Sequence, residues 1–358
     1  MELTPFQPLK LLRHSDRIEA MLRDELVYPI SVEMDLSNTC PHDCPFCSFG
    51  TSKSQGYRQQ NWVQFSTPRA IALLDELKEC GVKSVTFTGG GEPLIHKEAA
   101  AILEKAASLG LEFGVVSNGF LLKGAEQDVI AKHATFLRVS LDAGTPETHQ
   151  FTHGTPMLQF HQILANLRAT REKAGPRLTI GASFCVMDQN WKEIYLAAKQ
   201  VKDAGANYLE VRPTFPTDWR GDGWGNALSP ANVDAAKVEI AHARAHLDDA
   251  TFQIIGMIER FDSLAAPTKA YAQCRIGPLT TVIGADGRLW HCCVNRGIEF
   301  FNIASVASMS FKDAWAEAQA KRMHEQIDVS KCPRCRYDGF NRVIESTFLK
   351  NEMHANFV

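Results

Sequence analysis

Three cysteines stand close together near the start of the chain, in the stretch CPHDCPFC. They are Cys40, Cys44 and Cys47. Three thiolates on one short loop can hold three corners of a cubane, because soft sulfur ligands select iron–sulfur clusters or zinc. A structural zinc site needs four ligands, and the nearest candidate, His42, lies inside the loop in a poor position. Three ligands would leave one iron open to chelate a small molecule through an amine and a carboxylate.

A second set of cysteines lies in the C-terminal part of the chain. Cys274, Cys292, Cys332 and Cys335 offer four thiolates, enough to close a second cluster. A structural zinc ion with four cysteine ligands is the alternative that spacing alone leaves open. Cys293 either replaces Cys292 as a ligand or is a spare thiol.

The composition is that of an ordinary globular chain. The 358 residues are 45% hydrophobic and 22% charged, and the net charge is −3, so bulk attraction to nucleic acid is not expected. No apolar run reaches the ~18 residues that span a bilayer, and charges and proline interrupt the N-terminus, unlike a secretory signal. We therefore expect a cytoplasmic protein with no membrane partner. Its thiols stay reduced, with Cys80 and Cys185 as small buried hydrophobes.

Strand and helix patterns alternate along most of the chain, which predicts an α/β fold with a parallel sheet and helices outside it. Period-two and β-branched runs predict six strands, and apolar residues at helical spacing predict the helices between them. The expected strands lie within 30–36, 83–88, 111–119, 136–144, 177–187 and 207–213. The expected helices are 68–80, 96–110, 125–132, 158–174, 191–205 and 230–247, followed by a hairpin around 285–287 and a helix at 311–327.

Polar residues and glycines follow several of these strands. Function collects at the carboxyl ends of the strands in parallel sheets. The residues at these ends are Cys40, Gly89 to Glu92, Ser117 and Asn118, Ser140 and Asp142, and Arg212. We therefore expect one shared site at one edge of the sheet.

The first cysteine motif resembles the hallmark of the radical S-adenosylmethionine (radical SAM) superfamily, CxxxCxxC after the first strand of a partial (β/α)6 barrel. The resemblance covers roughly 30–213 and includes the aromatic Phe46 before the third cysteine and the run GGGEP after the second strand. It implies that a 4Fe–4S cluster on the three cysteines binds and cleaves SAM. The resulting 5′-deoxyadenosyl radical abstracts hydrogen from an unactivated carbon, and a flavodoxin- or ferredoxin-type protein supplies the electron.

The same resemblance assigns roles to residues at the strand ends. It implies that Gly89, Gly90, Gly91 and Glu92 bind the methionyl ammonium of the cofactor and that Phe46 packs by its adenine. It further implies that Ser117, Asn118 and Ser140 contact the ribose and the methionyl carboxylate, and that Arg212 lies near the adenine or the substrate. Strand-end polar groups that cap helices or bond to the backbone are the alternative for the two serines and Arg212.

The C-terminal cysteines resemble the SPASM/twitch extension of radical SAM enzymes. Full SPASM domains carry more cysteines, so the resemblance implies the shorter twitch form, with one auxiliary 4Fe–4S cluster closed by four ligands. The expected organisation is an N-terminal arm over 1–29, the barrel over 30–228 and a small α+β twitch-like domain over 229–358.

A closed auxiliary cluster can accept an electron, as in twitch enzymes that oxidise alcohols. The resemblance therefore favours oxidation of a small polar molecule, such as a sugar, cyclitol or aminoglycoside. Such a reaction needs a base near the substrate hydroxyl, and strand-end position makes Arg212, His153 and Asp142 candidates.

Three other functions stay open. Epimerisation needs a free thiol that returns hydrogen, and Cys293, Cys185 or Cys80 could supply it. Peptide modification uses the same architecture, but those enzymes usually carry an N-terminal peptide-recognition domain, and only about 30 residues precede the first strand. A non-catalytic iron–sulfur or zinc protein would have no need of a site for the methionyl ammonium.

Overall fold

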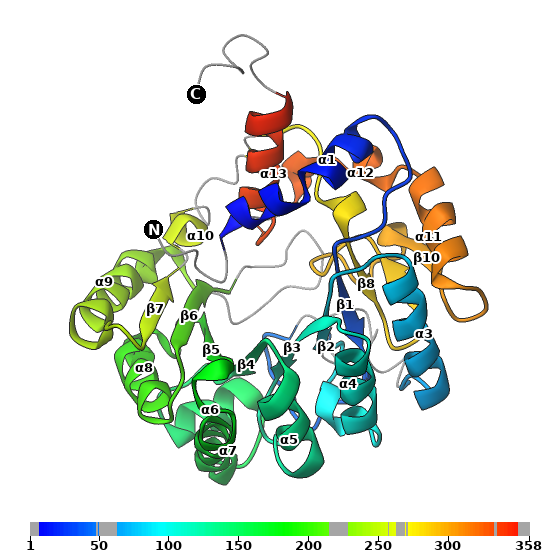
Figure 1. Cartoon of the computed structure of the whole chain (residues 1–358). Helices are drawn as coiled ribbons and strands as arrows, with labels where there is room; N and C mark the ends of the chain where they lie inside the picture. The colour runs from blue at the N-terminus through cyan, green and yellow to red at the C-terminus, as the bar shows by residue number, and fades with distance from the viewer. Residues whose placement is uncertain are drawn as a thin grey trace.

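A computed structural model of the chain describes residues 7–47, 49, 63–214, 228–256, 258–262, 269, 271–332 and 335–349. Its centre is one ten-stranded sheet with the strand order β10-β9-β8-β1-β2-β3-β4-β5-β6-β7. The sheet curves into an open arc, and helices α3 to α9 lie along its outer side (Figure 1). None of the described helices is long and apolar enough to cross a membrane.

Seven neighbouring strands of this sheet are parallel, the six that the alternating pattern predicts and one more, β7. They are β1 (Ser31–Asp35), β2 (Ser84–Thr88), β3 (Glu112–Ser117), β4 (Phe136–Ser140), β5 (Thr179–Val186), β6 (Tyr208–Pro213) and β7 (Gln253–Gly256). The helices outside them are α3 (Thr67–Glu79), α4 (Ala99–Ser108), α5 (Gly124–His133), α6 (Pro146–His153), α7 (Leu158–Ala174), α8 (Ile194–Asp203) and α9 (Pro230–Leu247). Apolar side chains from both layers form the main core, so the expected α/β fold class is confirmed.

The C-terminal part of the chain continues the same sheet on the other side of β1. Strand β8 (Thr280–Ile283) runs parallel to β1, with Thr280 opposite Ser31. Strands β9 (Arg288–Trp290) and β10 (Asn302–Ser305) follow in antiparallel order. Helices α10 (Ile258–Asp262), α11 (Phe311–Ala320), α12 (Met323–Gln326) and α13 (Asp338–Ile344) complete this part. The tail is therefore joined to the barrel through backbone pairing at β1.

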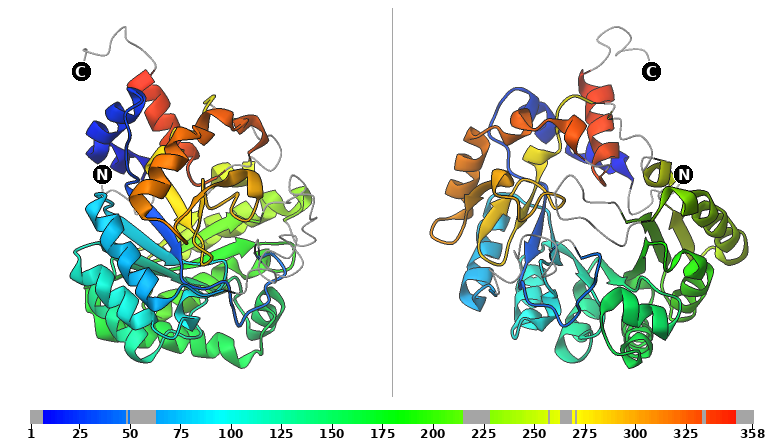
Figure 2. Two further views of the ribbon diagram at one scale, coloured as in Figure 1. Left: turned by 90° about the vertical axis from the view of Figure 1, so that its right-hand side faces the viewer. Right: turned by 180° about the vertical axis from the view of Figure 1, so that it is seen from behind.

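The N-terminal arm is helical and packs on the tail. It consists of the 3₁₀ helix η1 (Pro8–His14) and helix α1 (Ser15–Leu22). Leu11 and Ile18 of the arm share a second core cluster with Ile276 and Ile344 of the tail. In two views, α1 and α13 lie together at the open side of the arc (Figures 1 and 2). The arm and the tail therefore close the side that the strands leave open.

Several details differ from the sequence-based expectation, which included neither strand β7 nor strand β10. Helix α6 was not predicted, because its sequence, PETHQFTH, has no apolar stripe; Thr145 Oγ1 caps it by accepting a hydrogen bond from Thr148 N at 3.2 Å. The single helix expected over 311–327 is two helices, since Arg322 takes a left-handed φ of 43° between them. A residue in that conformation cannot continue a right-handed α-helix, and the conformation is costly for a residue other than glycine.

Candidate metal and cofactor site

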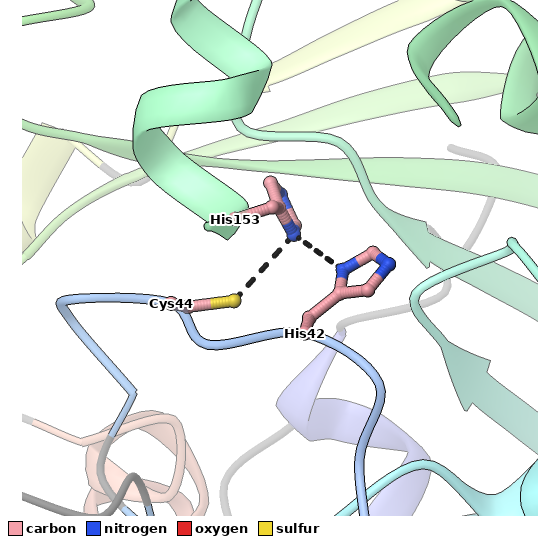
Figure 3. A group of neighbouring side chains, drawn as sticks. All are labelled: His42, Cys44 and His153. Atoms are coloured by element: carbon pink, nitrogen blue, oxygen red, sulfur yellow. Dashed lines mark hydrogen bonds between the residues drawn. The ribbon is translucent and has the colours of Figure 1, made fainter. Parts of the chain in front are cut away.

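The first cysteine loop follows β1 and is held as a tight turn by a hydrogen bond from Cys47 N to Cys44 O at 3.0 Å. Each of its three thiols faces a nitrogen. Cys40 accepts from His42 N at 3.5 Å, Cys47 accepts from Phe49 N at 3.4 Å, and Cys44 Sγ lies 3.5 Å from His153 Nδ1 (Figure 3). The two backbone N–H groups stabilise negative sulfur. The donor set therefore fits a cluster held by three thiolates.

The glycine run after β2 touches this loop backbone to backbone. Gly91 N donates to Ser37 O at 3.0 Å, and Glu92 N donates to Thr39 O at 2.8 Å. A side chain at Gly91 would place its Cβ 2.1 Å from Thr39 O. Only glycine permits this approach, so the run fixes the loop beside Glu92.

The carboxylate of Glu92 is buried and accepts three hydrogen bonds. Ser117 Oγ and Leu94 N donate to Oε1 at 2.8 and 3.1 Å, and Asn118 N donates to Oε2 at 2.8 Å. Burial raises the pKa of Glu92 to about 7, although these hydrogen bonds act in the opposite direction. Asn118 also points its Nδ2 at Cys40 Sγ, 3.8 Å away. The structure thus gathers Glu92, Ser117 and Asn118 beside the loop, in a place that suits a ligand cation.

A cavity of about 1100 Å³ lies inside the arc and reaches both cysteine groups. The expected site residues Phe46, Gly89, Ser140 and Arg212 line it, together with Cys47 from the first group and Cys335 from the second. His153 and Asp142 do not line it. Both are buried behind the first loop, so the geometry is unfavourable for the expected role as a base near substrate.

Arg212 enters this cavity from the end of β6. Its Nη1 lies 3.5 Å from Glu210, and its Nε donates to Cys185 Sγ at 3.4 Å. Arg138 also binds Glu210, at 2.6 Å. Because guanidinium groups stay charged in proteins, two cations share one carboxylate here. Arg212 is therefore suited to bind an anionic group rather than to accept a proton. Burial raises the pKa of Cys185 to about 12, which keeps it a thiol.

The four tail cysteines come together from separate segments. Cys274 precedes β8, Cys292 follows β9, and Cys332 and Cys335 precede α13. Burial, and then charge on the three other thiols, raises the pKa of Cys274. Cys293 lines the cavity, and burial raises its pKa to about 12. Cys292, Cys332 and Cys335 thus lie near Cys274, and Cys293 faces the cavity.

No three of the tail thiols, within the described part of the chain, all lie within 4.8 Å of one another. Within the part of the chain that the structure describes, only His42, Cys44 and His153 bring three possible ligand atoms within 4.8 Å of one another. Sulfurs around one tetrahedral zinc ion lie about 4 Å apart, since each Zn–S bond is about 2.3 Å.

Sequence reasoning missed an ion pair that joins the tail to the barrel. Arg296 binds Asp35 of β1, and the two side chains are 5% and 0% exposed. The Arg296 guanidinium also lies 4.3 Å from the ring centre of Phe49 on the first cysteine loop. The partners are 261 residues apart, so no local pattern could have revealed the pair.

Two family models match the sequence in the regions that hold these residues. The model of the radical SAM superfamily matches residues 34–201, and the model of the SPASM iron–sulfur cluster-binding domain matches residues 274–336. All seven cysteines of the two groups lie inside the matched ranges.

Several characterised proteins are similar along most of the chain. PqqA peptide cyclase of Granulibacter bethesdensis is 23% identical over 84% of this chain and 77% of its own. The antilisterial bacteriocin subtilosin biosynthesis protein AlbA of Bacillus subtilis is 23% identical over 88% of this chain and 68% of its own. Streptococcus suis SuiB bound to S-adenosylmethionine shares the fold, with a TM-score of 0.64 and 15% identity over 86% of this chain and 71% of SuiB. A structure of SuiB with its precursor peptide SuiA gives a TM-score of 0.62, with 15% identity over 88% of this chain and 71% of SuiB.

Proposed function

Because this chain belongs to the radical SAM superfamily and carries a SPASM iron–sulfur cluster-binding domain, we propose that it modifies a peptide by radical chemistry. The family, the fold class and the cofactors expected from the sequence are confirmed. The substrate expected from the sequence, a small polar alcohol, has less support. The relatives carry the proposal, since they are named as a peptide cyclase and a bacteriocin biosynthesis protein, and SuiB is bound to a precursor peptide.

Different residues around the first loop would bind the cluster and the methionyl group of SAM. In this superfamily, a 4Fe–4S cluster with bound SAM supplies a 5′-deoxyadenosyl radical that takes a hydrogen atom from the substrate. Cys40, Cys44 and Cys47 would ligate the cluster. Glu92, already oriented by Ser117, would accept hydrogen bonds from the methionyl ammonium.

The cavity supports a substrate that carries carboxylates. Of the described residues that line it, seven are arginine or lysine and three are aspartate or glutamate. Burial, and then the charge of nearby Arg212, lowers the pKa of Arg260, while the charge of Glu210 opposes this effect. A wall with more basic than acidic groups attracts anions, and a peptide can offer anions through acidic side chains or its C-terminus. A neutral sugar or cyclitol cannot.

The test is a turnover assay with the reconstituted protein. Peptides encoded beside its gene are incubated anaerobically with the protein, SAM and dithionite, which replaces the flavodoxin or ferredoxin, and the products are analysed by mass spectrometry. We expect 5′-deoxyadenosine together with a peptide that has lost hydrogen or exchanged it with solvent. The triple variant in which Cys40, Cys44 and Cys47 are alanine should give neither product.

The same assay separates the alternatives. Oxidation of an aminoglycoside or cyclitol, with no change in any peptide, would contradict the proposal and restore the small-molecule substrate. If the peptide takes up one deuterium from solvent and is otherwise unchanged in elemental composition, the reaction is an epimerisation. That result would point to Cys293 or Cys185 as the hydrogen donor.

A further inference from the structure

Two arginines meet one glutamate on the cavity wall formed by β4 and β6. Glu210 and Arg212 stand two residues apart on β6, so they share one face of the strand, and both line the cavity with Arg138 of β4. Strand β5 lies between β4 and β6, and its residue opposite Glu210 is the small Ser183. The Arg138 side chain therefore crosses β5, and its Nη1 lies 2.6 Å from Glu210 Oε2.

The carboxylate of Glu210 is divided between the two guanidinium groups. Its Oε2 accepts from Arg138, and its Oε1 lies 3.5 Å from Arg212 Nη1. A guanidinium carries five N–H groups. Arg212 uses Nε on Cys185 Sγ, whereas Arg138 leaves its Nε without a partner. Among the described residues, the Nη2 of neither arginine makes a hydrogen bond. The pair therefore keeps donors for a further acceptor.

The cationic groups of this cluster remain accessible while its carboxylate is covered. The side chain of Glu210 is 2% exposed, whereas those of Arg138 and Arg212 are 14% and 29% exposed. Burial raises the pKa of Glu210, but the charges of Arg138, Arg212 and Arg260 outweigh burial and hold the pKa below its ordinary value. Glu210 therefore stays ionised and holds both guanidinium groups at the cavity wall.

A third arginine adds to the positive charge. Arg260 lies on α10, which packs against β6, and it lines the same cavity. Its charge acts on both Glu210 and Arg212. Because guanidinium groups stay charged in proteins, three cations surround one carboxylate here.

Two further carboxylates, Asp142 and Asp338, act on these arginines through their charge. Among the described residues, neither carboxylate forms an ion pair with an arginine of the group. Each instead has a partner of its own, namely His153 and Lys269, at 3.3 and 2.8 Å. The direct contacts of the three arginines with described carboxylates are thus limited to Glu210, and the group as a whole attracts an anion.

The three arginines stand apart from the residues that would hold the methionyl group of SAM. Glu92 follows β2, whereas Arg212 is on β6, and three strands lie between β2 and β6. Neighbouring strands are about 4.8 Å apart, so β2 and β6 are separated by roughly 19 Å along the curved sheet. An anion at Arg212 is therefore expected to belong to the substrate rather than to the methionyl carboxylate.

We propose that Arg138 and Arg212, held together by Glu210, form a subsite that binds a carboxylate of the peptide substrate, with Arg260 as a further positive charge. The planar fork of a guanidinium matches the two oxygens of a carboxylate. That carboxylate belongs to an aspartate or glutamate side chain or to the C-terminus of the peptide. The inference rests on the proposed peptide function and names the chemical group that the cavity recognises.

The first test measures the affinity of reconstituted protein for the peptide that the turnover assay identifies. Neutral versions of that peptide replace each acidic side chain by its amide, or the C-terminus by a carboxamide. We expect one neutral version to bind wild type about 10- to 100-fold more weakly than the parent peptide. Arg212→Gln should bind the two peptides about equally, because the partner of the carboxylate is gone.

Arg342→Gln is the matched control. Arg342 lines the same cavity from α13, so this variant removes the same charge from a different element and should discriminate between the peptides as wild type does. Arg212→Lys keeps a charge but loses the planar fork, and it should recover part of the discrimination. Arg212→Lys decides if Arg212→Gln fails to hold iron.

A second test needs no substrate peptide. Phenylglyoxal modifies guanidinium groups, and mass spectrometry of the digested protein gives the rate of modification at each arginine. We expect glutarate, but not its neutral diamide, to slow the modification of Arg212 more than that of Arg342. This result would show that the subsite binds a carboxylate even when the parent molecule is not known.

Three results would overturn the subsite. One is equal discrimination between the peptides by wild type and Arg212→Gln, and another is equal protection of Arg212 and Arg342 by glutarate. The third is a loss of SAM affinity in Arg212→Gln that exceeds the loss of peptide affinity, because the bound carboxylate would then be that of SAM. If no peptide is modified but glutarate protects Arg212, the peptide function is contradicted and the carboxylate subsite is supported.

Discussion

Environment gives residues of the same type different roles around this site. Cys44 faces a buried imidazole, whereas burial raises the pKa of Cys185 and of Cys293 to about 12 and keeps them thiols. Glu92 is buried among hydrogen-bond donors, whereas Glu210 is shared by two arginines that hold its pKa down against burial. The sequence motif identified Glu92 as a cofactor-binding residue. Only the packing shows that its ionised form, buried without a cation, lowers the stability of the folded protein.

The cost of the Glu92 charge predicts a pH dependence of stability. Its pKa is about 7 in the folded protein and 4.5 ordinarily. Between these values the folded state binds more protons than the unfolded state, so stability falls as pH rises. We expect the free energy of unfolding of wild type to fall by up to about 3 kcal/mol as pH rises through this range. Glu92→Gln should remove this fall. Urea unfolding of cluster-free reduced protein at pH 5 and pH 8 measures it.

Glu104→Gln is the matched control for this experiment. Glu104 is an exposed carboxylate on helix α4, so its loss should leave the pH dependence unchanged. A wild-type pH profile in Glu92→Gln would mean that Glu92 is ionised without penalty before any cofactor binds.

At the scale of elements, periodicity predicted the parts of the fold whose apolar residues face one core. The expected strand at 30–36 and the expected helix at 158–174 are examples, since both bury regular apolar positions. Helix α6 escaped prediction because its inner face carries His149 and His153 instead of an apolar stripe. That same departure from pattern is what places a polar group behind the cysteine loop. Strand β7, which was not predicted, is short, and it packs against β6 and α9. These neighbours are distant in sequence or belong to other elements, so the residues of β7 alone do not indicate a buried strand.

The contact between the glycine run and the cysteine loop predicts that Gly91→Ala separates these two elements. The new Cβ would overlap Thr39 O and Asn38 C, at 2.1 and 2.5 Å. Backbone cannot move aside as a side chain can, so we expect a cost of about 2–3 kcal/mol. The loop that carries Cys40 should shift as well. Iron content after reconstitution and urea unfolding measure the two effects.

Gly175→Ala separates backbone strain from overlap. Gly175 has φ 57° and ψ −151°, a backbone region that essentially only glycine adopts, with open space around it, so alanine there should cost about 1–3 kcal/mol through backbone strain alone and leave the iron content unchanged. Equal iron content in Gly91→Ala and wild type would show that the two elements are not tightly coupled.

At the scale of the molecule, the tail and the barrel form one continuous structure around the cavity. Strand β8 pairs with β1 along the backbone, and Arg296 of the tail binds Asp35 of β1 while covering Phe49. Burial raises the pKa of Asp35, and the charge of Arg296 opposes that rise. The pair therefore connects the segment that follows Cys292 to the loop that holds the first three cysteines.

This connection predicts that Arg296→Met destabilises the whole molecule. Removal of one partner leaves the Asp35 carboxylate buried and uncompensated, which costs about 3–5 kcal/mol. The double variant Asp35→Asn with Arg296→Met should recover most of that loss, because no charge is then left unpaired. Arg288→Met, which breaks a more exposed pair with Asp286 in the same tail, should cost less than about 1 kcal/mol. Urea unfolding of wild type, Arg296→Met, Asp35→Asn and the double variant gives the coupling energy, with Arg288→Met as the control. Additive losses would show that Arg296 acts through packing on Phe49 alone.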